Sequence, residues 1–204
     1  MASILKVDTI QDQSGNNIIN ESSDTITIGA SGDTVNIVGT LQNNGSGVIQ
    51  GITEADQWRL TADFTGNADP ITSNLERNDT TGSGYFGTGM TESSGIFTFP
   101  STGYWLILAD FSCQNISSNA AYNFFLKITT DNSTYNKGAD AYVNPNNNGS
   151  NTIGRSIQFL FDVTNTTTHK IQFGTTSSDP TNSVTTGNTT YNGTSFSFIR
   201  LGDT

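Results

Sequence analysis

From residue 51 onward, the chain is a succession of short runs rich in aromatic and β-branched residues, separated by clusters of Asn, Ser, Thr, Gly and Pro. Runs bounded by such turn residues are typical of β-strands. No segment shows a sustained helical period, and the best candidate, at Glu54, Ala55 and Asp56, offers one turn at most. The chain is therefore expected to be all-β, with two packed sheets. The expected strands cover residues 58–64, 95–99, 104–112, 122–128, 138–143, 153–163, 169–173 and 194–201.

Two of these runs contain few polar residues. Residues 104–111 read YWLILADF, and residues 157–163 read IQFLFDV. A strand with one wet face alternates apolar and polar residues, so nearly continuous apolar runs indicate strands covered on both faces. The cover would come either from the rest of the sandwich or from a contact between subunits.

A short internal repeat lies in the N-terminal part of the chain. The tripeptide DTI at residues 24–26 returns nine residues later as DTV at residues 33–35. Each copy alternates β-branched and polar residues and ends at glycine, which is typical of short strands broken by turns. Two copies cannot bury their apolar face alone, whereas three chains around one axis could each turn that face inward. The predicted trimer core is Ile26, Ile28, Val35 and Ile37.

The stretch NNGSGVIQG at residues 43–51 is polar and glycine-rich, and a denser apolar pattern follows it. We therefore expect an N-terminal β-stalk or anchor at residues 1–50 and a head domain at residues 51–204. The single cysteine, Cys113, excludes an intrachain disulfide and is expected to be a buried, inert thiol.

The net charge of −10, with only 8 Lys and Arg residues, argues against nucleic-acid partners and anionic lipid surfaces. There is no charged-then-apolar leader and no unbroken apolar run of about 18 residues. The sequence therefore predicts neither a signal peptide nor membrane insertion.

In the segment SSGIFTFPSTGYWLILADFS, Gly95, Phe97 and Pro100 are followed by Gly103, Tyr104 and an apolar run. This order resembles the core motif of the tumour-necrosis-factor-like family, which includes the globular heads of the complement first component. The residues also have physical roles of their own. Pro100 ends a strand, Gly103 permits a tight turn, and Tyr104 is expected to begin a strand that buries aromatic area.

Two further segments fit the order of strands in that family, namely FGTGM at residues 86–90 and the Phe-rich closing run at residues 194–202. The resemblance covers about residues 55–204. It implies a trimeric jelly-roll β-sandwich. Members of the family that are secreted animal proteins carry signal peptides and often collagen stalks, which this sequence lacks, so animal signalling is not expected of it.

The opening segment MASILKVDTIQDQSGNNIINESSDTITIGASGDT resembles the leader of many virion fibre proteins of marine and cyanobacterial phages. In those proteins the leader precedes interchangeable tip domains. The resemblance implies a bacteriophage virion protein that is made in the host cytoplasm and contacts other virion proteins through its N-terminal segment.

Motifs for chemistry are sparse. Residues 82–87 match GxGxxG, but Gly-Thr-Gly follows where a helix would have to begin, so we interpret the match as a turn. The only histidine, His169, lacks a nucleophile motif and is expected to be a surface or strand residue. Asp110 and Asp162, both inside apolar runs, are the pair that could bind calcium or cleave glycosidic bonds, although a structural role is the simpler interpretation. No other cofactor is expected.

The function predicted from the sequence is that of a trimeric, non-enzymatic fibre or spike that attaches a phage to a host surface glycan or protein. Neutral polar loops suit weak contacts multiplied by avidity. The alternatives are a capsid decoration trimer that binds no receptor and, less favoured, a polysaccharide depolymerase. The candidate receptor-binding residues are Asn67, Asn74, Tyr135, Tyr142, Asn146 and Tyr191.

Overall fold

The structure is a computed structural model, and it describes residues 38, 42–43, 46–47, 51–115, 120–144 and 152–204. The chain divides into two units, Met1–Val48 and Ile49–Thr204. The first unit includes the paired two-residue strands β1 (Gln42–Asn43) and β2 (Ser46–Gly47). The predicted trimer core and one receptor-binding candidate lie outside the described residues and stay predictions; they are Ile26, Ile28, Val35, Ile37 and Asn146.

The second unit is all-β, as predicted. Its described residues contain no α-helix, only the 3-10 turn η1 (Pro180–Asn182), and no helix there is long and apolar enough to cross a membrane. Its strands are β3 (Ala55–Leu60), β4 (Phe64–Thr65), β5 (Leu75–Arg77), β6 (Thr91–Ser93), β7 (Ile96–Thr98), β8 (Gly103–Asn115), β9 (Tyr122–Thr129), β10 (Asn136–Val143), β11 (Ile153–Val163), β12 (Lys170–Ser177), β13 (Ser183–Thr185) and β14 (Ser195–Gly202).

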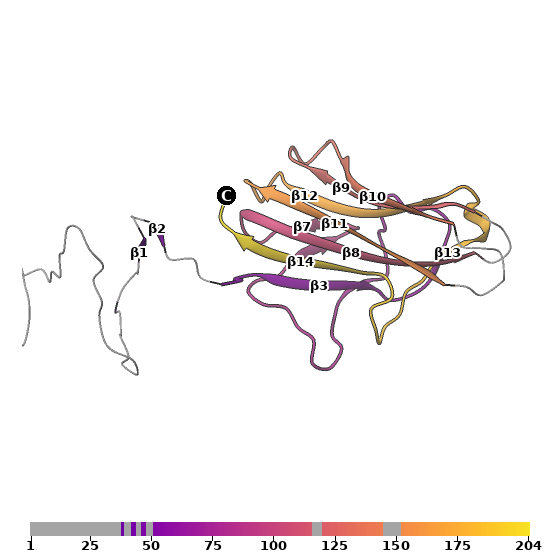
Figure 1. The fold of residues 1–204 in the computed structure, drawn as a ribbon, viewed down its shortest axis with the longest axis horizontal. Helices are drawn as coiled ribbons and strands as arrows, with labels where there is room; N and C mark the ends of the chain where they lie inside the picture. Colours follow the sequence, from indigo (N-terminus) through magenta and orange to yellow (C-terminus); the bar gives the residue numbers. More distant parts are fainter. Residues whose placement is uncertain (1–37, 39–41, 44–45, 48–50, 116–119, 145–151) are drawn as a thin grey trace, which may run out of the picture. The chain divides into compact units, whose positions relative to one another are not determined.

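These strands form two layers that pack face to face (Figure 1). One sheet has the order β10-β9-β12-β7-β6, and every pairing in it is antiparallel. In the other sheet, β8 pairs along one edge with β11 and along its other edge with β14 and β13. Outside these, β3 pairs with β14, and β5 pairs with β3. We call the second layer the β8 sheet.

The helical turn considered at Glu54–Asp56 is wrong, because β3 begins at Ala55. Its Asp56 is 4% exposed and accepts hydrogen bonds from the Met90 amide at 2.7 Å and the Trp58 indole Nε1 at 3.0 Å. The Arg77 Nε lies 3.1 Å from the same carboxylate. Met90 and Arg77 are distant in the sequence, and Trp58 lies on the same strand. Their hydrogen bonds hold Asp56 in an extended strand, a conformation that the local sequence alone does not dictate.

Aromatic side chains fill the space between the sheets. Phe97 from β7 lies at the centre of the cluster, 1% exposed, with ring centroids 5.4 Å from Trp58 and 5.2 Å from Phe198. Phe173 and Phe196 stack across the sheets at 3.9 Å. Edge-to-face and offset aromatic pairs contribute about 0.5–1.5 kcal/mol each beyond the area they bury. The core therefore combines Phe97 of the predicted motif with aromatic residues that precede and follow the motif in the sequence.

The motif glycines are required by their backbone. Gly95 has φ +82°, and a Cβ there would lie 2.2 Å from the carbonyl oxygen of Ile71. Gly103 has φ +136°, and its Cβ would lie 2.4 Å from the carbonyl oxygen of Gly202. The expectation for Tyr104 is wrong, because Tyr104 is 41% exposed and the neighbouring Trp105 is buried instead. Strand alternation places only one of two adjacent aromatics inside.

Cys113 lies on the inward face of β8 and is fully buried, as expected. Loss of hydration on burial raises the pKa of its thiol to about 12, against a smaller opposing effect of the Arg155 charge. The thiolate that would react with oxidants or alkylating agents is therefore scarce at neutral pH.

The two apolar runs become β8 and β11, which pair along their whole length. Their inward residues are buried, but their outward residues are not. Leu106 and Leu108 of β8 are only partly buried, and Leu160 of β11 is 56% exposed. The sequence left open whether the rest of the sandwich or a contact between subunits covers both faces of these strands. The sandwich covers only their inward face.

Candidate functional site

An apolar row crosses the outward face of the β8 sheet. The register sets Leu160 of β11 beside Leu106 of β8, and Leu106 beside Ile199 of β14. The row continues through Ala55 of β3 to Phe86, which forms an isolated bridge with Ala55 through two hydrogen bonds of 2.9 and 2.7 Å. Residues directly opposite in a sheet point to the same side, so all five side chains share one surface.

Two further side chains of β8, Tyr104 and Leu108, stand on the same surface as Leu106, because they are two residues away along the strand. Phe86 is 59% exposed, Leu160 56% and Tyr104 41%. Large contiguous apolar patches on a protein surface are typical of contact sites. We call the seven residues the apolar face: Tyr104, Leu106, Leu108, Ala55, Phe86, Leu160 and Ile199.

The other half of β8 is polar on its outward side, where Asp110, Ser112 and Gln114 replace the apolar residues. Three hollows lie along this half, with volumes of about 490, 400 and 380 Å³. The first shares Ser112 and Gly193 with the second, and Asp110 and Ser156 with the third, so the three are continuous. We call the hollows the polar groove.

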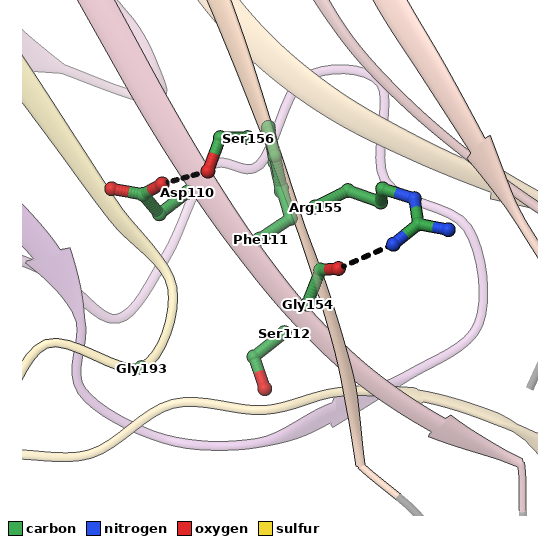
Figure 2. A pocket seen from close by; sticks show the side chains of 7 residues that line it. All are labelled: Asp110, Phe111, Ser112, Gly154, Arg155, Ser156 and Gly193. Carbon is green, nitrogen blue, oxygen red and sulfur yellow. Dashed lines mark hydrogen bonds between the residues drawn. The ribbon is translucent and has the colours of Figure 1, made fainter.

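Residues from three segments line the polar groove. The floor comes from β8, one wall from β11, and the other wall from the loop before β14 together with Asp63. Figure 2 shows the middle of the groove, where Asp110 accepts a hydrogen bond from the Ser156 hydroxyl. The Arg155 side chain extends away from Asp110 and donates to the Gly154 carbonyl at 3.2 Å. Within the described residues, the Asp110 carboxylate is therefore paired with the Ser156 hydroxyl and not with an arginine.

The loop wall, residues 186–193, is fixed to the sheet by main-chain contacts. Its Thr186 amide donates to the Ser112 carbonyl at 2.8 Å, and its Gly187 amide donates to Asp63 Oδ1 at 2.9 Å. A Cβ on Gly187 would lie 2.6 Å from the carbonyl oxygen of Ala62, so only glycine fits there. The wall is thus built in advance of any ligand.

The receptor-binding candidates do not form one cluster. Asn67 and Asn74 have structural roles in the backbone. Asn67 Oδ1 accepts a hydrogen bond from the Ser177 amide at 2.7 Å, and Asn74 has a left-handed backbone conformation with φ +59°. The Tyr135 hydroxyl is buried and has no hydrogen-bond partner among the described residues, so Tyr135 is not an open loop residue.

Two candidate tyrosines are well exposed. Tyr142 is 65% exposed on β10 of the other sheet, and Tyr191 is 62% exposed in the wall of the polar groove. The sequence did not single out Asp63, Gln114 or Asn188, which line the same hollow as Tyr191. Nothing in the sequence pattern signals that residues 63, 114 and 188 converge, since tertiary pairing alone brings them together.

Asp110 and Asp162 do not share a site. Asp110 faces Ser156 across the strands, while Asp162 faces Tyr104, six residues away along β8. At about 3.3 Å per residue the two carboxylates are about 20 Å apart, beyond the 5–9.5 Å of paired glycosidase carboxylates. Among the described residues, no group of three or more His, Cys, Asp or Glu side chains could hold a metal ion.

His169 is 8% exposed, and so the surface position considered for it is wrong. Its ring nitrogens lie 3.2 Å from the Thr164 hydroxyl and 3.1 Å from the Thr168 hydroxyl, and the ring stacks on Phe161. Both nitrogens are thus engaged by threonines and not by the members of a catalytic triad. The GxGxxG match at residues 82–87 is a turn followed by no helix, as expected.

No protein-family model matches the sequence, and no curated protein matches it. Solved structures match the fold. The structure of Eiger TNF from S. frugiperda has a TM-score of 0.54 at 10% identity, over 76% of this chain and 96% of that one. Murine APRIL at pH 5.0 and at pH 8.0 gives TM-scores of 0.53 and 0.51 at 8% and 9% identity, over 72% of this chain and 98% of each. The chain therefore has the jelly-roll β-sandwich fold of tumour-necrosis-factor-like proteins, as its motif implied.

Proposed function

We propose that the chain is a homotrimeric fibre or spike protein of a bacteriophage particle, and that its jelly roll attaches the particle to the host cell surface. It acts by binding and not by catalysis. The observation that carries the proposal is the apolar face, which one sandwich leaves uncovered.

The apolar face supports self-association. Fully burying a Leu or Phe side chain contributes about 1.5–3 kcal/mol, so an exposed row of such residues favours a partner over water. Around a closed axis, three identical sheets could each present this face to the next copy. Such a contact would cover the outward face of β8 and β11, the strands that the two apolar runs form.

The ends of the sandwich suggest which loops meet the host. Residues 51–54 lead into the start of β3, and the partner strand β14 finishes at the same end with Gly202. The loop at residues 186–193 and the ends of β8 and β10 lie at the opposite end (Figure 1). If residues 1–50 dock on the virion, that opposite end is the one free to reach a receptor.

Adsorption and imaging test the proposal together. The labelled full chain is expected to bind some members of a panel of marine bacteria and cyanobacteria, and antibody against it to mark the tail or protruding fibres of intact particles. Label confined to the head lattice, with no cell binding, would support the decoration trimer instead. Release of sugars from host polysaccharide would favour the depolymerase.

A further inference from the structure

We infer that the polar groove is a binding site for a neutral oligosaccharide, with Tyr191 as the surface against which a sugar ring packs. The inference deepens the proposed function and rests on it for its biological meaning. It names the chemical class of the receptor and the side chains that read it.

The polar groove offers hydrogen-bonding atoms that no other described residue uses. Asp63 Oδ1 holds the Gly187 amide, but Asp63 Oδ2 has no partner among the described residues. Asn188 Oδ1 accepts from Thr190, and within the same part of the chain its Nδ2 and the Gln114 amide are free. A carboxylate accepts two hydroxyls, and a primary amide both donates and accepts, so this set matches the hydroxyls of a sugar.

Tyr191 adds an apolar platform beside these groups. Its ring is 62% exposed, and it lines the hollow that contains Asp63, Gln114 and Asn188. A tyrosine ring supplies a large rigid contact area at low conformational cost and keeps a polar hydroxyl at its edge. A pyranose has the complementary surfaces, with C–H groups on its faces and hydroxyls around its rim.

The charge of the polar groove selects against acidic sugars. Two carboxylates, Asp63 and Asp110, line it together with one arginine, Arg155, whose side chain points away from Asp110. The chain as a whole carries a net charge of −10. An anionic sugar would be repelled at close range. Neutral sugars are therefore the favoured ligands.

The polar groove and the apolar face divide β8 between them. The apolar face uses Tyr104, Leu106 and Leu108, whereas the polar residues of the groove run from Asp110 to Gln114. The two regions meet at Leu108, which also lines the third hollow. Burying the free carboxylate and amide atoms of the groove between subunits without partners would cost about 1–3 kcal/mol each. A trimer that forms through the apolar face therefore leaves the polar groove exposed to solvent and accessible to a ligand.

The test uses the full chain on an array of immobilised neutral and acidic oligosaccharides from the surface polysaccharides of marine bacteria and cyanobacteria. Wild type is expected to bind neutral members. Tyr191→Ala should weaken binding at least ~10-fold, in line with the cost of losing a central aromatic contact. Asp63→Asn should also weaken it. Tyr85→Ala removes a tyrosine that is 51% exposed and lines none of the three hollows, and it should leave the Kd within about twofold of wild type.

Each outcome tests either sugar binding by the polar groove or attachment of the chain to cells. Binding to no oligosaccharide, or equal losses from Tyr191→Ala and Tyr85→Ala, overturns the groove as a sugar site. Cell adsorption that resists periodate but is lost after protease treatment of the cells keeps the attachment function and refutes the sugar. Array binding that depends on Tyr191, without adsorption to any cell, keeps the sugar site and refutes attachment.

Discussion

At the scale of single residues, Arg59 is the charged side chain on which the outward face of β3 most depends. It is fully buried, and its guanidinium contacts Glu76, Asp79 and the Thr80 hydroxyl. Hydrogen bonds to charged groups contribute about 1.5–3 kcal/mol, although partners near the surface regain water when the arginine is lost. We expect Arg59→Met to lower the free energy of unfolding by about 2–4 kcal/mol.

Arg59→Lys is the matched control, because it keeps the charge and loses the planar fork that reaches several acceptors at once. It should recover only part of the loss. Urea denaturation followed by tryptophan fluorescence measures both variants. A methionine variant as stable as wild type would show that the contacts of Arg59 contribute nothing net.

Asp131 gives the turn between β9 and β10 a dependence on pH. Its carboxylate accepts from the Thr134 amide at 2.7 Å, the Thr129 hydroxyl at 2.7 Å and the Ser133 amide at 2.9 Å. These bonds, the Thr134 amide foremost, hold the pKa of the carboxyl well below its usual range. A depressed pKa stabilises the fold above the unfolded value of about 3.9, and the effect fades as pH falls below it.

Asp131→Asn should therefore melt at a lower temperature than wild type at pH 7, and the gap should narrow between pH 4 and pH 2.5. Asp203→Asn is a suitable control, because its exposed carboxylate lies near the C-terminus and has a single arginine partner. Melting curves at several pH values measure the gap. A gap that stays constant over this interval would contradict the role given to the carboxylate.

Residue roles could be predicted from the sequence where the local backbone decides them. Gly103 was placed correctly because a tight turn beside a strand needs glycine, whereas Gly95 was expected to begin a strand and lies in the turn before β7. For His169 the strand-entry alternative was right, because β12 begins at Lys170, but the surface alternative was wrong, since Phe161 and two threonines cover the ring. For the same reason Tyr191 was noticed as a tyrosine in a polar loop, whereas its neighbours in the polar groove were not.

At the scale of elements, the long strands were predicted, and of the strands of two or three residues only β7 was. The range expected at residues 153–163 matches β11, and β8, β9 and β14 differ from expectation by a few residues at their ends. Strands of two or three residues, such as β5, β6 and β13, are too short to show a period and exist only by pairing with distant segments. The fold class could be predicted from composition and pattern. The apolar face could not, because it forms only when strands that are distant in the sequence pair.

The apolar face leads to a prediction about β11. Leu160→Asp in the full chain should oppose trimer assembly, because each copy loses about 1.5–3 kcal/mol of burial and three carboxylates must be desolvated. Tyr142→Asp is the control, with similar exposure on the other sheet. Light scattering over a dilution series should show a trimer for wild type and Tyr142→Asp, and a trimer that dissociates at a higher concentration for Leu160→Asp. Trimers of equal stability from both variants would exclude the apolar face as the contact.

At the scale of the whole molecule, two separate regions are proposed to hold three chains together, the apolar face of the head and the N-terminal repeat. The repeat lies outside the described residues, so its trimer core stays a prediction from alternation in two glycine-ended copies. Ile28→Asp should place three carboxylates near one axis, where desolvation and mutual repulsion both oppose assembly. Thr27→Asp, on the opposite side of the strand by alternation, should be far milder.

The two variants are compared by melting of the full chain and by incorporation into particles. Because the head has its own apolar face, Ile28→Asp is expected to leave a trimeric head whose N-terminal segment melts early, while Leu160→Asp loosens the head itself. If a buried N-terminal axis exists, Ile28→Asp and Leu160→Asp together should yield monomers, since neither contact then remains. Equal effects from Ile28→Asp and Thr27→Asp would refute that axis and favour an N-terminal segment that lies extended on a virion partner, with the head alone responsible for the trimer.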